Sequence, residues 1–170
     1  MKEYLSDMFK KIILSWNDFD IYVISLFVYD DNDNPLEPTV TLGYNTYSNL
    51  QKNIDFAWDE SEAKWNYAYW LQNEEFVFGS GKTKQIVQDW VSDNLETLTM
   101  DESGITNLFI KMLIDIVKEL HSSGFIVKKF GKKIPIIIHE LEYYDEIANQ
   151  NIEANGYELV KDFVDFCSDL

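Results

Sequence analysis

The run Ile-Tyr-Val-Ile-Ser-Leu-Phe-Val-Tyr, residues 21–29, is the strongest indication of the fold in this 170-residue chain. Its β-branched and aromatic residues favour a strand, and apolar side chains at both odd and even positions indicate burial on both faces. Residues 30–35 have the composition of a turn, and residues 39–44 alternate as in a second strand. We therefore expect the two strands to pair antiparallel.

Apolar residues at helical spacing predict helices around these strands. Amphipathic helices are expected over residues 3–16, from near Ser48, after the capping residue Thr83, and over residues 105–120 and 157–167. Residues 75–78 and 134–141 predict further strands, and residues 125–133 fit either a helical continuation or a hairpin arm. Residues 143–155 should form a loop with one helical turn. The sequence therefore predicts a single α+β domain over residues 1–170, with a small, mainly antiparallel sheet packed by helices.

Charge restricts the partners that this protein can bind. Thirty acidic residues stand against fourteen basic ones, the formal net charge is −16, and every basic residue is a lysine. A chain without arginine lacks the planar fork that suits phosphate, and its overall field repels polyanions. We therefore expect no binding to nucleic acid or to an anionic membrane, and a faster encounter with a basic protein. The acidity could instead serve solubility alone.

Cysteine content and apolar runs indicate the cellular compartment. The chain has one cysteine, Cys167, and its first residues lack the apolar core of a signal peptide. No apolar run reaches the length of a membrane span. These features predict a reduced, cytoplasmic protein.

Two short motifs resemble ligand-binding loops but fail on spacing. The run Gly-Ser-Gly-Lys-Thr at residues 79–83 lacks the earlier glycine of a phosphate-binding loop, because Phe76 stands at that position. Aspartate and asparagine at positions 30, 32 and 34 have the spacing of calcium ligands, but Pro35 replaces the obligatory glycine. We interpret the first as a strand-to-helix turn and the second as a solvated turn.

Histidine and cysteine do not form a recognisable site. His139 lies in a predicted strand, and the only other nitrogen or sulfur donors for a metal are His121 and Cys167. No motif supports a nucleophilic pair between cysteine and histidine. We expect His121 to complement a helix C-terminus, Cys167 to fill the core, and the protein to bind no metal or cofactor. The basic run of residues 128–133 is expected to neutralise neighbouring acids.

Residues 56–70 are dense in aromatic side chains. They carry six aromatic rings and three carboxylates, with no glycine or proline. At helical spacing Ile54, Trp58, Glu62 and Trp65 would share one face, so a helix could not bury every ring on one side. The segment is therefore either the centre of a small core or a recognition surface.

Several short elements follow one another along the chain in a recognisable order. They are the strand of residues 22–29 with its acidic turn, the strand of residues 134–139, the pairs Asn45-Thr46, Lys64-Trp65 and Tyr69-Trp70, and Asn149, Asn151 and Asn155. In this order they resemble a bacterial family of domains of unknown function that look like polymorphic-toxin immunity proteins. A more distant likeness is to the cell-wall-regulator-like immunity superfamily. The resemblance implies neutralisation of one cognate toxin, and it favours Trp65 and Trp70 as core anchors.

We therefore predict a non-enzymatic, acidic protein that binds a cognate basic toxin, such as a nuclease, and covers its active site. Two groups of residues are expected to make the contact: Trp58, Asp59, Glu60 and Glu62, and then Glu140, Glu142, Asp145 and Glu146. Trp58, ringed by acids, should be exposed. A hydrolase with a carboxylate-lined pocket and a regulatory adaptor remain alternatives, and the oligomeric state stays open.

Overall fold

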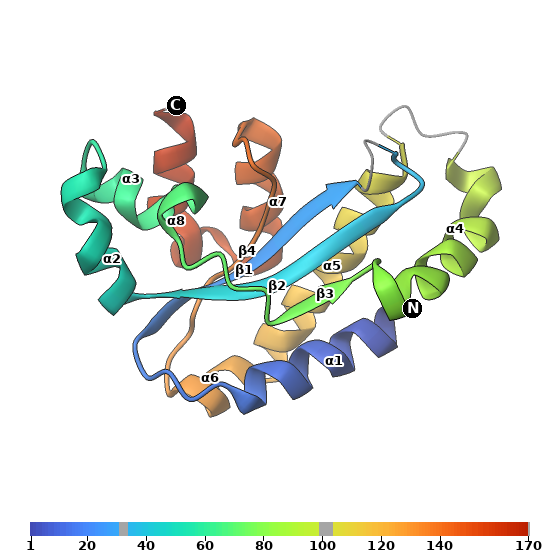
Figure 1. Cartoon of the computed structure of the whole chain (residues 1–170), viewed down its shortest axis with the longest axis horizontal. Helices are drawn as coiled ribbons and strands as arrows, with labels where there is room; N and C mark the ends of the chain where they lie inside the picture. The colour runs from blue at the N-terminus through green and yellow to red at the C-terminus, as the bar shows by residue number, and fades with distance from the viewer. Residues whose placement is uncertain (31–33, 99–103, 170) are drawn as a thin grey trace.

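A mixed β-sheet lies at the centre of the molecule (Figure 1). The computed structural model describes residues 1–30, 34–98 and 104–169. Among these residues the strand order is β3-β2-β1-β4, with the bounds β1 Ile21–Asp30, β2 Pro38–Thr46, β3 Phe76–Phe78 and β4 Ile136–His139. β2 pairs antiparallel with β1 and β3, whereas β4 pairs parallel with β1. The predicted α+β fold with a mainly antiparallel sheet is confirmed.

Helices account for most of the other described residues. They are α1 (Lys2–Ser15), α2 (Tyr47–Asn53), α3 (Glu60–Trp65), α4 (Lys84–Leu98), α5 (Gly104–Ser122), α6 (Phe125–Phe130), α7 (Asp145–Asn155) and α8 (Tyr157–Ser168). α1, α5 and α8 follow the apolar stripes of the sequence, as predicted. The ambiguous residues 125–133 contain the helix α6 rather than a hairpin arm.

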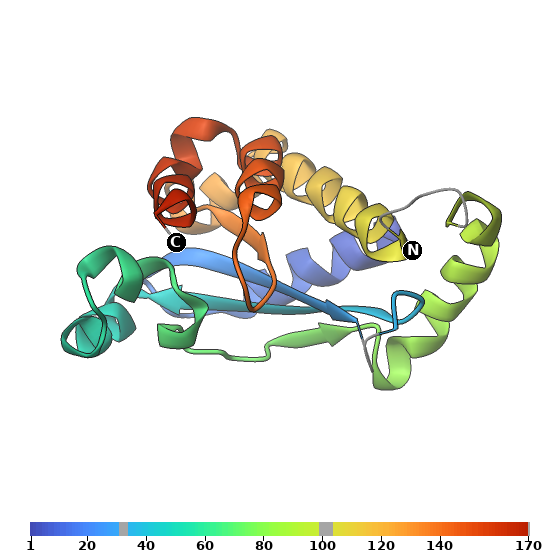
Figure 2. The ribbon, with the colours of Figure 1, turned by 90° about the horizontal axis from the view of Figure 1, so that it is seen from above.

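The sheet separates two hydrophobic cores. On one face Ile24, Leu26 and Val28 of β1 pack with apolar residues of α1, α4, α5 and α6. On the other face Val23 and Ile137 pack with residues of α2, α3, α7 and α8. In Figure 1, α1 and α6 lie below the sheet and α3, α7 and α8 above it, and Figure 2 shows α7 and α8 side by side. Residues 21–26 are therefore covered on both faces, as their composition predicts, whereas Tyr29 near the end of the strand is 38% exposed.

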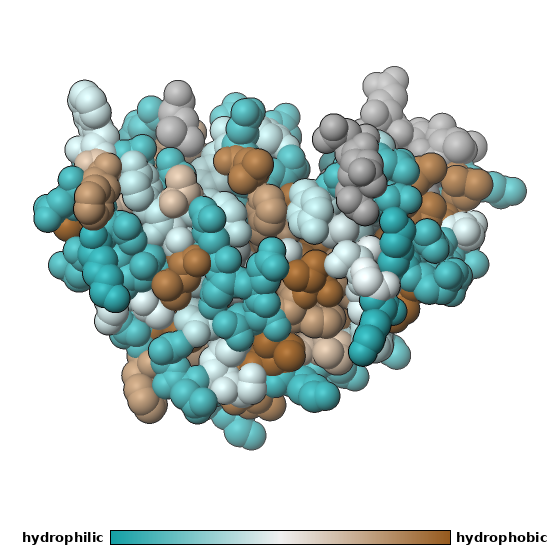
Figure 3. All heavy atoms as spheres, viewed as in Figure 1, coloured by the Kyte–Doolittle hydropathy of each residue, from teal (hydrophilic) through white to brown (hydrophobic). Residues whose placement is uncertain are grey.

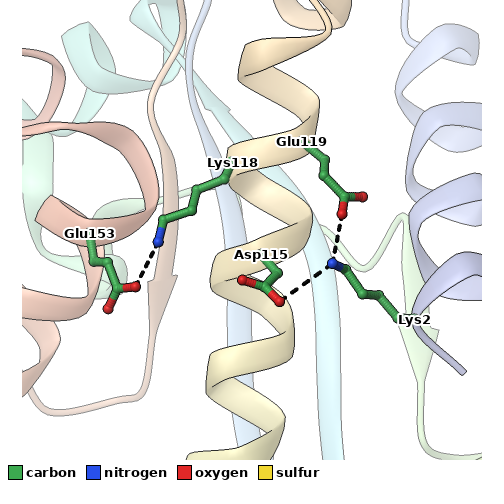
Figure 4. Close-up of polar contacts among 5 residues, drawn as sticks. All are labelled: Lys2, Asp115, Lys118, Glu119 and Glu153. Atoms are coloured by element: carbon green, nitrogen blue, oxygen red, sulfur yellow. Dashed lines mark hydrogen bonds and ion pairs between the residues drawn. The ribbon is translucent and has the colours of Figure 1, made fainter.

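Ion pairs join α5 to the helices on either side of it (Figure 4). The Lys2 ammonium of α1 lies 2.6 Å from Glu119 and 3.4 Å from Asp115, and the Lys118 ammonium lies 2.6 Å from Glu153 of α7. The hydrogen bond to Glu119 is the main cause of the raised pKa of Lys2. These groups lie at the surface, where a pair typically contributes less than about 1 kcal/mol. The apolar stripe of α5 therefore holds the helix more strongly than its charges do.

Side-chain amides of α7 cover the outer edge of β4. Asn151 Oδ1 accepts a hydrogen bond from the Ile138 N–H at 2.8 Å, and Asn151 Nδ2 donates to the Ile138 carbonyl at 2.7 Å. One helical turn later, Asn155 makes the same two bonds with Ile136, each at 2.9 Å. An amide side chain offers a donor and an acceptor as a peptide group does. The two asparagines therefore satisfy the edge that another strand would otherwise pair with.

The helix α7 corrects the expectation of a loop over residues 143–155. Its buried residues are Ile147, Ala148, Asn151 and Ala154, which lie at helical spacing. An asparagine in the middle of this stripe weakens the apolar periodicity that a sequence prediction depends on. Burying its amide is favourable because the β4 backbone pairs with it.

Replacing Asn151 by alanine should lower the free energy of unfolding by about 1–3 kcal/mol. The change leaves the buried Ile138 N–H without its partner, whereas the Ile138 carbonyl keeps the bond from Gln150 Nε2. Urea denaturation can compare this variant with Asn149→Ala, which alters an exposed asparagine of the same helix. We expect the control to stay within about 0.5 kcal/mol of the wild type. Equal losses in both variants would contradict the role of Asn151 at the β4 edge.

The aromatic segment of residues 56–70 is not one helix. After α2 the chain makes a 3-10 turn at Ile54–Phe56 and starts α3 only at Glu60. Ile54 and Trp58 therefore do not share a helical face with Glu62 and Trp65, contrary to the spacing argument. Helix α2 begins at Tyr47, with Thr46 as its N-cap, one residue before the expected Ser48.

Trp65 and Trp70 are core residues, as predicted, with 4% and 5% of their surfaces exposed. The Lys64 carbonyl accepts hydrogen bonds from Trp70 Nε1 at 2.9 Å and from the Tyr22 hydroxyl at 2.6 Å. The Trp65 carbonyl accepts another from the Tyr143 hydroxyl at 3.1 Å. These bonds fasten the aromatic segment to β1 and to the connection between β4 and α7.

Candidate partner-binding surface

The first group of predicted contact residues lies where the chain enters α3. Trp58 is 95% exposed, and Phe56 beside it is 76% exposed. Asp59 Oδ1 accepts a hydrogen bond from the Glu62 N–H at 2.8 Å, and Glu62 Oε2 accepts one from the Trp58 N–H at 2.6 Å. The spacing Asp-x-x-Glu is a capping-box signal for a helix start, which our sequence reading missed. Asp59 and Glu62 therefore hold the loop that presents Trp58, and Glu60 is exposed beside it.

The second group lies near a groove at the carboxyl ends of β1 and β4. The groove encloses about 470 Å³ and is lined by Phe27, Val28, Tyr29, Asp30, Glu140, Leu141, Glu142 and Tyr144. β1 pairs with the end of β4 at Phe27 and then continues to Asp30, whereas the chain after His139 turns away toward α7. This divergence leaves a hollow beside β1, which we call the carboxylate groove.

Aromatic rings and carboxylates share the carboxylate groove, and none of the described residues that line it is a lysine. Phe27 stacks on Tyr29 with ring centroids 5.5 Å apart and on Tyr67 at 5.1 Å. The Tyr144 hydroxyl donates to Glu140 Oε1 at 3.0 Å. Burial and the charge of Glu140 raise the pKa of Tyr144 to about 12, so its hydroxyl stays protonated at neutral pH. Ring faces beside carboxylates favour a cationic occupant.

Asp145 and Glu146 do not line the groove. Both lie in the first turn of α7 and are exposed. Carboxylates at this position interact favourably with the positive end of the helix dipole. Of the second predicted group, the structure therefore brings only Glu140 and Glu142 to the groove.

A smaller hollow lies between the carboxylate groove and the end of α3. It encloses about 320 Å³ and is lined by Asn66, Leu141, Glu142, Tyr143 and Phe166, so Leu141 and Glu142 border both hollows. The Leu141 side chain between them is 75% exposed. Trp58 precedes α3 and Asn66 follows it, so this short helix of about 9 Å connects the loop of Trp58 with the smaller hollow.

His139 is fully buried under aromatic rings at the end of β4. Its Nδ1 lies 3.0 Å from the Glu140 carbonyl and must donate to it, so Nε2 accepts from the Ser25 hydroxyl at 2.8 Å. Burial lowers the pKa of His139 to about 4. A serine hydroxyl donating to histidine is the arrangement of a nucleophile and its base. Ser25 is only 4% exposed, however, and neither residue lines the carboxylate groove.

The other candidate ligands have structural surroundings. His121 lies in the last turn of α5, as expected, with Nε2 3.0 Å from Asn155 Oδ1. Cys167 is buried in the core of α8, and burial raises the pKa of its thiol to about 12. Within the described ranges, no group of three histidine, cysteine, aspartate or glutamate side chains is placed to hold a metal ion.

The run Gly-Ser-Gly-Lys-Thr forms a turn that a threonine side chain closes. In the turn at residues 79–83, the Thr83 hydroxyl accepts from the Gly79 N–H at 2.9 Å and donates to the Ser80 carbonyl at 2.9 Å. Thr83 therefore closes the turn ahead of α4. Asn32 of the calcium-like spacing lies outside the described residues.

The surface of the molecule is mainly hydrophilic on the face shown in Figure 3. Apolar residues form small groups there, separated by hydrophilic ones, over most of the described part. No helix in the described ranges is long and apolar enough to cross a membrane. Recognition through this kind of surface depends on charge and on a few exposed rings.

Comparison with known proteins assigns no relative: no protein family, curated protein or solved structure matches this chain. The candidate surface therefore stands on geometry alone. Sequence reasoning missed the groove residues Phe27, Tyr29, Asp30, Leu141 and Tyr144. Alternation along β1 places Phe27 and Tyr29 on one face, but only the parallel pairing with β4 brings Glu140 and Glu142 beside them.

Proposed function

We propose that this chain is a non-enzymatic binding protein that neutralises a basic protein partner by covering its active site. The observation that carries the proposal is the nearly complete exposure of Trp58 beside Asp59 and Glu60. An exposed tryptophan gains a large buried area when a partner covers it, and such residues often dominate binding energy. Carboxylates around it attract a basic surface and repel acidic ones.

The carboxylate groove supports the same proposal from a second element. Its lining, as far as the structure describes the chain, has three carboxylates and three aromatic rings but no lysine, so it suits a lysine or arginine side chain of the partner. Among the described residues, neither Glu140 nor Glu142 lies within ion-pair distance of a lysine. Ser25 and His139 are buried, so a substrate cannot reach them. Their burial therefore favours a binding function over a hydrolase.

The resemblance to polymorphic-toxin immunity proteins indicates the kind of basic partner that we propose, a bacterial toxin. A bacterial toxin that acts on a polyanion, such as a nuclease, needs a basic cleft for its substrate. An acidic protein with one exposed tryptophan would reach that cleft quickly and exclude the substrate from it. We place the protein in the cytoplasm, where such a toxin would act and where Cys167 stays reduced.

Replacing Trp58 by alanine should weaken partner binding by at least about tenfold without changing the fold. The partner is first isolated from the native host on immobilised protein and identified by mass spectrometry, and its affinity is then measured by calorimetry. Phe19→Ala is the matched control, because Phe19 is a fully exposed ring in the connection from α1 to β1. An acidic partner, or equal affinity of the Trp58→Ala variant and the wild type, would overturn the proposal.

The carboxylates can be tested with the same partner by measuring its association rate at several salt concentrations, for example by surface plasmon resonance. Glu140→Gln with Glu142→Gln should slow association and reduce its dependence on ionic strength, because charge acts mainly on the encounter rate. Asp93→Asn with Asp165→Asn removes the same charge from exposed positions outside the groove. Equal effects of the two double variants would show that net charge, rather than the groove, attracts the partner.

A further inference from the structure

Four lysines from three separate parts of the sequence line one hollow on the α8 side of the molecule. Lys64 comes from α3, Lys132 and Lys133 from the connection between α6 and β4, and Lys161 from α8. We call this hollow the lysine pocket. The chain holds fourteen lysines against thirty acidic residues, so chance would surround a hollow with carboxylates. Among the described residues that line the pocket, only Glu158 and Asp162 are acidic, so the lining is positive.

The ammonium groups of the lysine pocket differ in their partners. Lys64 Nζ lies 3.0 Å from Asp162 and 4.9 Å from the centre of the Trp65 ring. Elsewhere, described lysines such as Lys2 and Lys118 also pair with carboxylates. Among the described residues, no carboxylate lies within ion-pair distance of Lys132, Lys133 or Lys161. Three ammonium groups around one hollow repel each other, and an anion between them would remove that repulsion.

The electrostatic effect of these lysines reaches neighbouring groups. Lys132 Nζ lies 5.5 Å from the centre of the Tyr47 ring, and its charge adds to the hydrogen bonds from Ser48 that lower the pKa of Asp20. Lys133 adds to burial in lowering the pKa of His121. The positive potential therefore extends around the pocket although the whole chain is strongly acidic.

The shape of the lysine pocket restricts its ligand. It encloses about 200 Å³, below the roughly 300–1,000 Å³ typical of sites for drug-sized molecules. Tyr22, Trp65, Ile134 and Pro135 form part of its wall. Glu158 and Leu159 bring the first turn of α8 to it, and the N-terminus of a twelve-residue helix adds positive potential. A small, compact anion fits these features, whereas the net charge of −16 disfavours a polyanion.

We propose that the lysine pocket binds a phosphate group, either as inorganic phosphate or as part of a small phosphomonoester. The flexible ammonium groups of Lys132, Lys133 and Lys161 would surround the phosphate oxygens as point charges. Binding would connect the α6–β4 connection with α8 through one ligand. This site lies outside the surface that we assign to the protein partner, so its function is independent of that assignment.

Calorimetric titration with inorganic phosphate at constant ionic strength tests the lysine pocket. Saturable binding is expected for the wild type, with affinity reduced at least about tenfold in Lys132→Gln with Lys133→Gln. Lys52→Gln with Lys128→Gln is the matched control, because both lysines are exposed and lie outside the pocket. The control removes two positive charges, as the test variant does. Absence of saturable binding, or an equal loss in the control, would overturn the proposal.

Further ligands identify the source of the phosphate and exclude other anions. Stronger binding of glycerol phosphate than of inorganic phosphate would indicate a phosphomonoester, and the reverse would indicate the free ion. Acetate or sulfate that binds as well as both phosphates would show an unselective anion site and overturn the assignment. The substituted lysines are exposed, so circular dichroism and thermal unfolding should match the wild type.

Discussion

Replacing Trp65 by alanine should lower the free energy of unfolding by about 3–5 kcal/mol. The indole is almost fully buried and packs edge-on against Tyr22 at 6.1 Å and Phe163 at 5.7 Å, measured between ring centroids. Its removal would leave a cavity between β1 and α8, because the surrounding elements cannot collapse fully into the space. Single domains are typically stable by about 5–15 kcal/mol, so this one change would remove a large part of the total.

Trp58→Ala is the matched control for the loss of Trp65. Both residues belong to the same aromatic segment, but the Trp58 side chain is almost fully exposed, and its loss should change stability by less than about 0.5 kcal/mol. Urea denaturation followed by circular dichroism measures both variants, and an unchanged m-value would show that the denatured state is comparable. A loss below about 1 kcal/mol for Trp65→Ala would show that α3 contributes little to the core.

Lowering the pH from 7 to 4 should reduce the free energy of unfolding by about 3 kcal/mol through His139 alone. The folded protein holds the pKa of His139 at about 4, because burial penalises the imidazolium. In the unfolded chain the imidazole takes up a proton below its ordinary pKa of about 6.5. The unfolded state therefore binds more protons between these two values, and stability falls as the pH decreases through that range.

Denaturation at several pH values in His139→Gln separates this effect from the carboxylates. The wild type should lose more stability between pH 7 and pH 4 than the variant, even if the variant is less stable at every pH. His121→Gln is the comparison, because burial lowers the pKa of His121 as well but its ring is only partly buried. The same pH dependence in the wild type and in His139→Gln would mean that the aromatic rings around His139 stabilise its protonated form.

Aromatic rings cover the buried pair of Ser25 and His139. Phe27, Tyr67 and Trp70 surround the imidazole at centroid distances of 5.6, 4.7 and 5.3 Å. Both nitrogens have a hydrogen-bond partner, so the neutral ring is buried without loss of hydrogen bonding. The aromatic segment thus covers the polar part of the sheet face, and Trp58 alone of its tryptophans remains outside.

A close approach of the chain completes this cover. Asn73 Oδ1 accepts a hydrogen bond from the Tyr44 N–H at 3.0 Å, and the Asn73 carbonyl lies where a Cβ on Gly43 would stand. A Cβ at Gly43 would meet that oxygen at 2.4 Å, so only glycine lets the backbone at Asn73 approach β2 this closely. A tertiary contact therefore requires the glycine in β2, and the local sequence pattern does not indicate that contact.

Elements that bury a regular apolar pattern can be predicted from the amino-acid order alone. The hairpin of β1 and β2 and the helices α1, α5 and α8 follow periods of two and of 3.6 residues, which depend only on local geometry. The sequence also indicated that Trp58, surrounded by Asp59 and Glu60, would be exposed. The net charge of −16 required no structure either.

Contacts between residues that are distant in the sequence depend on the packing of the whole fold. Asn151 is buried in a helix because the backbone of β4 pairs with it, and a local pattern contains no information about that partner. The parallel register of β1 and β4 placed Glu140 and Glu142 beside Phe27 and Tyr29, which forms the carboxylate groove. The packing of α8 against α3 and the α6–β4 connection brought together the lysines of the lysine pocket. Contacts between residues this far apart depend on how the elements pack on the sheet, and periodicity along the chain does not specify that packing.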